Sequence, residues 1–286
     1  VTALYNIVDQ IFIGQGVGML GNAATNIAFP LSTTCTAISL LLGIGSATNV
    51  SLKLGAGKEK ESASYAGCGI LLMAISGIAL FAITTLFLTP MLTFFGATKE
   101  VLPYAKQYTR ITAIGFPFLI MNTGMSKLIL ADGSPRYSMI SMLVGAIVNT
   151  ILDPIFIFSL HMGMTGAALA TATAPLIGMS ILSSHFWRRH NHFHLVRTHL
   201  TFKSIKDICS LGVSSLITEV SSGIVILVFN FLILDLSGNT GVAAYGILAN
   251  IALVLVAIFT GIGQGIQPIV SSHSGKSGKI VRQQTR

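Results

Sequence analysis

Long apolar runs separated by short polar segments dominate the chain, and a membrane-spanning helix needs about 20 mostly apolar residues. The pattern predicts the end of a first helix over residues 1–14 and a glycine-rich turn over 14–21. A second helix is expected from about Ala23 to Leu52. Residues 62–98 contain no charged side chain and predict a third helix with a loop, and a fourth runs from about Pro103 to Leu130.

Long apolar runs also fill the second half of the chain. Residues 137–187 are long enough for two helices, broken near 161–163. A polar, basic segment follows over 188–206, and two more helices are predicted over about 208–234 and 242–270. The sequence therefore predicts an all-α, polytopic membrane protein with eight spans, of which the first is truncated.

The composition supports the bilayer as the solvent of this chain. Only 9% of the 286 residues are charged and 52% are hydrophobic, with a mean hydropathy of +0.78. A soluble domain carries about 25% charged residues. The composition therefore disfavours a soluble enzyme, a disordered tail and a nucleic-acid-binding module.

The positions of the basic residues predict which loops face the cytoplasm. Lysine and arginine accumulate on the cytoplasmic side of membrane proteins. Here they gather in alternate loops: Lys53, Lys58 and Lys60; Lys127 and Arg136; Arg188, Arg189, Arg197, Lys203 and Lys206; Lys276, Lys279, Arg282 and Arg286. We expect these loops in the cytoplasm, which also accounts for the net charge of +8 without nucleic acid.

An internal repeat indicates a longer protein with two lobes. Gly43-Ile44-Gly45 resembles Gly261-Ile262-Gly263, and each is followed by a Gly-Lys pair, fourteen residues after its first glycine. Chance similarity between small residues is the alternative. Internal repeats are common in transporters whose halves rock around a central site. We expect about twelve spans in all, with a short N-terminal piece and about four C-terminal helices missing from this chain.

The repeat predicts three regions. These are an N-lobe over 1–190, a cytoplasmic linker over 191–206 and the start of a C-lobe over 207–286.

Acidic residues inside predicted spans point to function, because a charge at a helix centre costs about 2.5–3.5 kcal/mol on insertion scales. Asp9, Asp153 and Glu219 lie within spans, and no lysine or arginine shares the middle of those helices. They are expected to be protonated or matched by a bound cation. For Asp9 alone, a place in a water-filled cleft without a specific ligand is the alternative.

Asp153 lies in the most specific of these polar patterns. Asn149 precedes it by four residues and shares its helix face, while Pro154 frees the carbonyl of Thr150. A carboxylate, an amide oxygen and a free carbonyl suit a small cation. A hydrogen bond between helices at a kink is the alternative. Glu219 lies among serines and threonines, which favours a wet cavity wall over a purely structural role.

Five motifs together resemble the multidrug and toxic compound extrusion (MATE) family, in its bacterial branch. The motifs are Leu4-Tyr5-Asn6-Ile7-Val8-Asp9, Leu54-Gly55-Ala56-Gly57, Asn149-Thr150-Ile151-Leu152-Asp153-Pro154, Gly163-Met164-Thr165-Gly166-Ala167-Ala168-Leu169-Ala170-Thr171 and Gly263-Gln264-Gly265-Ile266-Gln267-Pro268. The resemblance covers essentially the whole chain. The resemblance implies a twelve-helix, two-lobe exporter of organic cations and drugs, working by alternating access in exchange for Na⁺ or H⁺.

The resemblance also implies site residues. The cation site would be formed by Asp9, Asn149, Asp153, Ala167 (through its backbone), Thr171 and, less closely matched, Tyr108. Glu219 matches a family acid on the seventh helix, and we expect it to serve the substrate cavity or coupling together with Gln264 and Asn26.

Several expectations about partners follow. We expect no cofactor other than the coupling ion Na⁺ or H⁺, no enzymatic activity and no nucleic acid. The partners would be small organic cations or drugs and the lipid bilayer, and the protein would be a monomer in the plasma membrane.

Two other function classes fit the sequence less well. A flippase for a lipid-linked precursor is the main alternative, but its cargo carries pyrophosphate and favours a basic cavity, whereas the intramembrane charges here are acidic. A membrane-embedded enzyme would need a motif such as His-Glu-x-x-His, which the sequence lacks.

Overall fold

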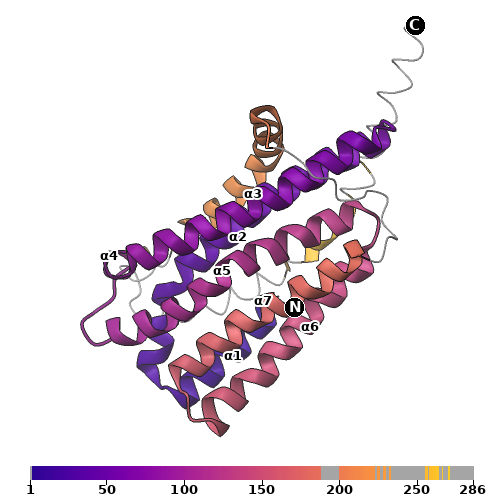
Figure 1. Cartoon of the computed structure of the whole chain (residues 1–286). Coiled ribbons are helices and arrows are strands. Elements are labelled where there is room, and N and C mark those ends of the chain that lie inside the picture. The colour runs from indigo at the N-terminus through magenta and orange to yellow at the C-terminus, as the bar shows by residue number, and fades with distance from the viewer. Residues whose placement is uncertain are drawn as a thin grey trace, which may run out of the picture.

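A computed structural model describes residues 2–187 and 200–222, together with scattered helical residues between 224 and 270. The chain is helical throughout these parts, as expected, and no strand occurs among the described residues (Figure 1). The labelled helices are α1 (Thr2–Gly16), α2 (Met19–Gly55), α3 (Glu59–Leu86), α4 (Leu88–Phe94), α5 (Leu102–Ala131), α6 (Pro135–Pro154), the π-helical η1 (Ile155–Ser159) and α7 (Met164–Trp187).

Five of these helical segments are long and apolar enough to cross a membrane: α2, α3, α5, α6 with η1, and α7. Helix α5 packs against α2, α3, α6 and α7, so it is the centre of the bundle. The predicted break near 161–163 is confirmed. His161 and Gly163 both have positive φ, at 51° and 54°, so the chain reverses direction between η1 and α7.

The glycine-rich turn is shorter than the sequence predicted. Helix α1 continues to Gly16 and α2 begins at Met19, so the prediction of a turn over 14–21 is wrong at both ends. Only Gly18 needs the left-handed region, with φ of 88°. Gly21 is helical and allows close packing, because a Cβ there would lie 2.8 Å from the side chain of Val17. The loop expected after the third helix also contains the short helix α4.

Helix α6 has its polar side chains inside and its apolar side chains outside. Its buried residues are Ser138, Ser141, Asn149 and Asp153. Its exposed large apolar residues are Met139, Ile140, Met142, Leu143, Ile147 and Ile151. In water this arrangement would be unfavourable, but in a bilayer the apolar side chains face lipid and the polar groups face the bundle. Helix α6 thus supports a membrane location independently of composition.

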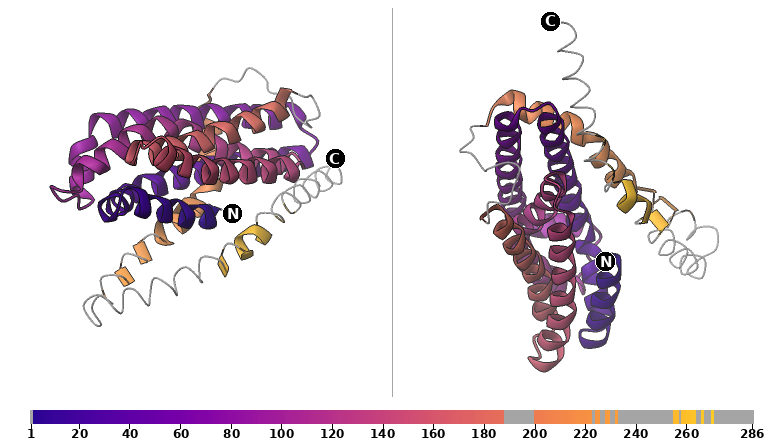
Figure 2. Two further views of the ribbon diagram at one scale, coloured as in Figure 1. Left: turned by 90° about the horizontal axis from the view of Figure 1, so that it is seen from below. Right: turned by 90° about the vertical axis from the view of Figure 1, so that its right-hand side faces the viewer.

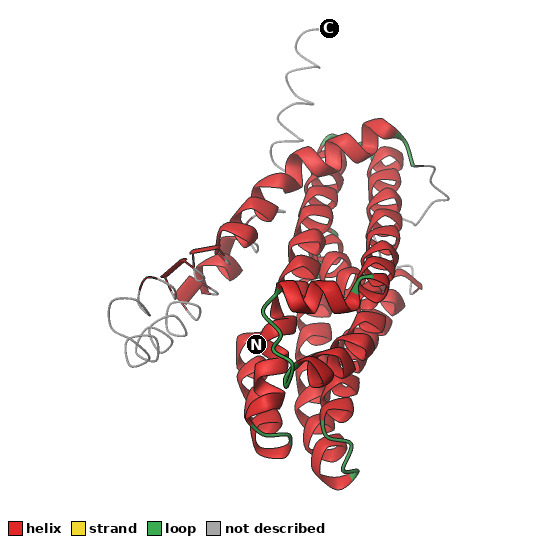
Figure 3. Ribbon diagram, turned by 90° about the vertical axis from the view of Figure 1, so that its left-hand side faces the viewer, coloured by secondary structure: helices red, strands yellow, loops and turns green. Residues whose placement is uncertain are grey.

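A further helix over 202–222 is attached to the bundle near its start and then runs obliquely away from it (Figures 2 and 3). Its first residues, 202–206, belong to the segment predicted as a linker. It crosses α2 where both helices have glycine: a Cβ on Gly45 would lie 2.0 Å from the carbonyl oxygen of Ile208, and one on Gly212 would lie 1.8 Å from that of Leu41. The hydroxyl of Tyr65 on α3 also donates to Asp207 Oδ2 at 2.6 Å.

Candidate cation site

The C-terminal end of α6 carries the polar pair that the sequence indicated. Asn149 is 1% exposed and Asp153 is fully buried, and their spacing of four residues places both on one helix face. Because Pro154 has no N–H, the carbonyl of Thr150 loses its α-helical donor. The chain then continues as η1, and π-helical turns of this kind are frequent at functional sites.

Asp9 approaches the same place from α1. Its side chain is 9% exposed and interacts directly with that of Asp153. The two acids therefore form one pair, although 143 positions separate them in the sequence. This contact was expected from the family resemblance and could not have been derived from either helix alone.

The approach of α1 to the π-helical turn depends on a glycine. A Cβ on Gly16 would lie 2.1 Å from Cγ2 of Ile157 and 3.1 Å from the ring of Phe158, so a larger residue cannot fit without movement. Next to this contact the rings of Phe12 and Phe158 pack edge to face, with their centroids 6.2 Å apart. Helix α1 is thus held against η1 at the depth that brings the two acids together.

The buried polar atoms of this cluster lack partners. Both carboxylate oxygens of Asp153, Oδ1 of Asp9 and both side-chain polar atoms of Asn149 have no hydrogen-bond donor or acceptor among the described residues. Neither acid forms an ion pair with any described lysine, arginine or histidine. Buried polar groups are nearly always paired. A cluster of so many unpaired polar atoms therefore indicates a missing partner, such as a proton or a metal cation.

Electrostatics leads to the same conclusion. Two ionised carboxylates about 4 Å apart repel by about 4 kcal/mol at an effective dielectric constant of about 20. Because Asp9 and Asp153 are in contact and buried, both cannot stay ionised without a compensating charge. A shared proton or a bound cation would supply that charge, and the free Oδ1 of Asn149 is available as an additional oxygen ligand.

Helix α7 supplies the next wall. In this antiparallel pair of helices, Gly145 of α6 faces the carbonyl of Ala174, and Gly178 of α7 faces the hydroxyl of Ser141. Continuing this register places Ala170 level with Asn149 and Gly166 level with Asp153, so the expected ligands Thr171 and Ala167 each follow one residue later on α7. The hydroxyl of Thr171 donates to the carbonyl of Ala167 at 3.0 Å, so that carbonyl is already engaged while the Thr171 oxygen can still accept or coordinate.

Tyr108 lies on α5 and is 8% exposed. It belongs to an apolar cluster with Ala167, Ile13 and Ile157. Tyr108 therefore lies near α7, α1 and η1, the elements next to the Asp9–Asp153 pair. Thr112, one turn further along α5, is buried on the same side, and its hydroxyl donates to the Tyr108 carbonyl at 3.1 Å. Thr112 was not expected from the sequence, although its spacing of four from Tyr108 was a usable signal.

Glu219 and Asn26, two of the residues expected to serve substrate or coupling, are not part of this cluster. Glu219 is half-buried on the helix over 202–222, and Asn26 is exposed on α2. Gln264 lies outside the described residues. The hydroxyl of Thr218 beside Glu219 donates to the carbonyl of Ser214 at 2.8 Å, so part of the polar environment of Glu219 serves its own helix.

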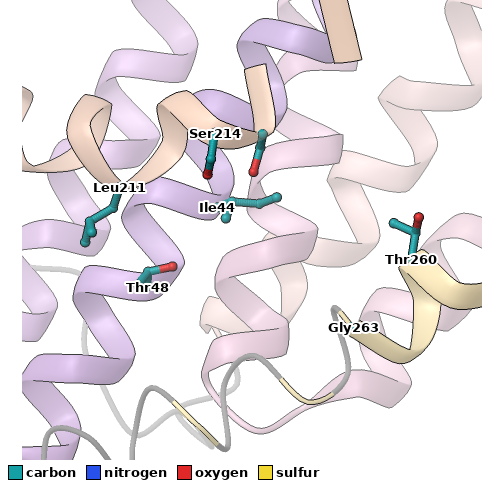
Figure 4. A pocket seen from close by; sticks show the side chains of 7 residues that line it. Ile44, Thr48, Leu211, Ser214, Thr260 and Gly263 are labelled. Carbon is teal, nitrogen blue, oxygen red and sulfur yellow. The ribbon is translucent and has the colours of Figure 1, made fainter. Parts of the chain in front are cut away.

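A cleft of about 410 Å³ opens between α2 and the later helical segments (Figure 4). It is lined by Ile44, Thr48, Leu211, Ser214, Ser215, Thr260 and Gly263. Ser214 and Ser215 come from the hydroxyl cluster expected to border a wet cavity, but Glu219 is not among the lining residues. The mixture of apolar and hydroxyl groups is suited to a small amphipathic molecule.

Known proteins resemble this chain over most of its length. The profile of the MatE family matches residues 1–155, more than half of the chain. Multidrug export protein MepA of Staphylococcus haemolyticus is 29% identical over 272 residues, covering 94% of this chain and 60% of the relative. MepA of Staphylococcus aureus strain NCTC 8325 is 25% identical over 272 residues. The chain thus spans about 60% of the length of these relatives.

Solved structures share the fold. A MATE protein in the straight conformation superposes with a TM-score of 0.90 at 23% identity, covering 99% of this chain and 63% of that protein. An outward-facing multidrug resistance MATE family transporter gives a TM-score of 0.83 at 23% identity, covering 96% of this chain and 59% of that protein. With the family profile and the expected motifs, these matches show that the chain is a multi-pass membrane protein that belongs to the MatE (multidrug and toxic compound extrusion) family.

Proposed function

We propose that this chain forms the cation-coupling part of a secondary active transporter, which exports organic cations or drugs in exchange for Na⁺ or H⁺ by alternating access. The observation that supports this most strongly is the buried contact between Asp9 and Asp153, beside the unpartnered side chain of Asn149. The relatives are named multidrug export proteins, and we expect a transporter without enzymatic activity in the plasma membrane.

The acidic pair supports a mechanism in which the coupling cation controls α1. Without a cation, repulsion of about 4 kcal/mol between two close carboxylates favours separation of α1 from α6. A proton or Na⁺ shared by Asp9 and Asp153 removes that repulsion and draws α1 onto the π-helical turn. Because Gly16 sits directly against Ile157, this closure reaches the end of α1 and the turn into α2.

Helix α2 connects this movement to the cleft. Its residues Ile44 and Thr48 border the cleft, while the start of the same helix follows α1 after only two residues. A movement of α1 therefore shifts the start of α2, the helix that forms one side of the cleft. The cation and the exported molecule compete through the two conformations, each favouring the one that it binds more tightly.

Efflux of an ethidium-like dye from cells with a full-length protein that contains this chain tests the proposal. Asp9→Asn and Asp153→Asn each remove one of the two carboxylates that share the cation and are expected to abolish dye efflux at unchanged protein levels. Glu100→Gln is the matched control, because Glu100 is an exposed acid in the turn before α5. Efflux that survives in both Asn variants would overturn the mechanism.

Independent variation of the Na⁺ and pH gradients in proteoliposomes then identifies the coupling ion. Accumulation of a lipid-linked precursor on deletion, with dye resistance unaffected, would instead identify a flippase.

A further inference from the structure

The π-helical turn η1 follows the cation site directly and contacts the helices on either side of it. Its first residue, Ile155, comes two positions after Asp153. Ile157 is 3% exposed and belongs to one apolar cluster with Ile13 of α1 and Met164 of α7. The position of Asp153 therefore depends on what holds η1 on the α1 side and on the α7 side.

On the α7 side, η1 is held through Gly166. A Cβ at this position would lie 2.8 Å from both the carbonyl carbon and the carbonyl oxygen of Phe156, and 2.9 Å from its Cβ. Ordinary contact between carbon atoms requires about 3.5–4.0 Å. Two of these three atoms belong to the backbone, so a change of side-chain rotamer cannot make room. Only glycine lets α7 approach the main chain this closely, three residues after Asp153.

The chain reversal after η1 holds the same carbonyl group from its other end. The backbone N–H of Met162 donates to the carbonyl oxygen of Phe156 at 3.0 Å, and that of Leu160 donates to the carbonyl oxygen of Ile155 at 2.9 Å. Between the two donors, His161 has a φ of 51°, which residues other than glycine rarely adopt. Phe156 therefore cannot move away from Gly166 without breaking a hydrogen bond of this tight reversal.

The first turn of α7 has a support of its own. Nε2 of Gln107 on α5 donates to the hydroxyl oxygen of Thr165, the residue before Gly166. The backbone N–H groups of Gly166 and Ala167 both donate to the carbonyl of Gly163, at 3.1 and 3.2 Å. Because α5 is the central helix of the bundle, this support belongs neither to η1 nor to α1. Helix α7 thus presents Gly166 to η1 as a fixed surface.

Helix α1 limits η1 on its other contact. Ile157 already lies against Gly16, where a Cβ would approach it to 2.1 Å. Helix α6, which carries Asp153, packs against both α1 and α7 (Figure 1). A methyl group added at position 166 would therefore push η1 without free space to receive it. Since Phe156 and Asp153 lie within one helical turn, the displacement would reach the acidic pair.

We propose that Gly166 is a positioning residue of the cation site, because it lets α7 contact the backbone of Phe156 and thereby holds Asp153 where it meets Asp9. The proposal rests on the proposed function, since the exact position of Asp153 matters for transport only if the acidic pair binds the coupling cation. Gly166 has this role without contacting the cation itself.

The geometry of the acidic pair makes its position sensitive to small movements. A hydrogen bond between two oxygen atoms spans about 2.5–3.0 Å. Relief of the contact at Gly166→Ala needs a separation of about 1 Å, which is enough to take Asp153 out of reach of a proton or metal cation shared with Asp9. The variant should therefore weaken cation binding. A purely structural role of Gly166 would instead lower the amount of folded protein or the maximal rate, with unchanged cation dependence.

The experiment measures uptake of an ethidium-like dye in proteoliposomes that contain a full-length protein with this chain. The driving gradient is whichever of Na⁺ and H⁺ drives the wild type. Gly166→Ala is expected to raise the cation concentration for half-maximal transport about tenfold, at the low end of what overpacking costs. The dye concentration for half-maximal transport, and the maximal rate at saturating cation, should stay within about twofold of the wild type.

Gly145→Ala is the matched control, because Gly145 lies in the same α6–α7 interface and a Cβ there would make an ordinary contact of 3.5 Å with the carbonyl oxygen of Ala174. It should leave the cation dependence unchanged. Thr165→Val removes the hydrogen bond from Gln107 without adding a clash, and it should raise the half-maximal cation concentration about threefold. This second variant keeps the test decisive if Gly166→Ala does not fold.

Two results would overturn the role of Gly166. One is wild-type cation dependence in folded Gly166→Ala, including a loss confined to the maximal rate. The other is wild-type cation dependence in Thr165→Val when Gly166→Ala does not fold. Absence of cation-driven dye transport in the wild type would overturn the proposed function itself, and the role of Gly166 with it.

Discussion

The contact between Gly16 and Ile157 provides a sharp prediction, because it sets how closely α1 approaches the acidic pair. A Cβ at position 16 would lie 2.1 Å from Cγ2 of Ile157. Ordinary carbon–carbon contact requires about 3.5–4.0 Å. Gly16→Ala therefore forces a displacement of about 1.5 Å, and overpacking of this kind costs about 1–3 kcal/mol.

The effect of Gly16→Ala on cation affinity depends on whether α1 or η1 moves. Ile157 is 3% exposed and cannot move outward freely, so we expect α1 to move away from η1 and Asp9 from Asp153. A cost of about 1.4 kcal/mol for restoring the closed arrangement would weaken apparent cation affinity about tenfold. The assay is the cation concentration that gives half-maximal dye transport in proteoliposomes.

A compensating variant makes this reasoning refutable. Ile157→Ala removes the clashing atom, and alone it costs about 2–5 kcal/mol through the cavity that it leaves. In Gly16→Ala/Ile157→Ala the new methyl group partly fills that cavity, so the double variant should recover cation affinity relative to Gly16→Ala. Gly14→Ala on the same helix is the control, because its nearest neighbour is the movable side chain of Asn22. Additive losses in the double variant would refute the account.

Three further predictions concern neighbouring contacts. Gly212→Ala should impair dye transport, because its Cβ would lie 1.8 Å from the Leu41 carbonyl oxygen; wild-type transport and melting temperature would contradict this crossing. Tyr65→Phe and Asp207→Asn should each lower unfolding stability by about 1 kcal/mol, with a double-variant loss smaller than their sum in thermal unfolding. Thr171→Ala should weaken the cation dependence of transport while Thr171→Ser preserves it, so equal behaviour of both variants would exclude the hydroxyl.

Much of the fold followed from local pattern. Charge-free runs predicted the membrane-length helices, and Gly163 marked the reversal before α7. The turn after α1 was misplaced because glycine has two uses, and sequence alone does not separate them: Gly18 adopts positive φ, whereas Gly21 permits close packing.

The site was predictable only in part. The spacing of Asn149 and Asp153 placed both on one face, but the contact with Asp9 depends on packing between distant helices. Pro154 signalled a disturbed helix, while the π-helical form that follows is decided by the neighbours of η1. The contacts of Ser141 could not be seen in advance, because Ser141 resembles any membrane serine until Gly178 and Asn122 are placed beside it.

The central claim is that a mobile cation occupies the Asp9–Asp153 pair and leaves when an organic cation is bound. The most direct measurement is the release of H⁺ or Na⁺, followed with ion-selective electrodes, when purified full-length protein is saturated with tetraphenylphosphonium. We expect release from the wild type and from Glu100→Gln, but not from Asp153→Asn. Equal release from Asp153→Asn would contradict it.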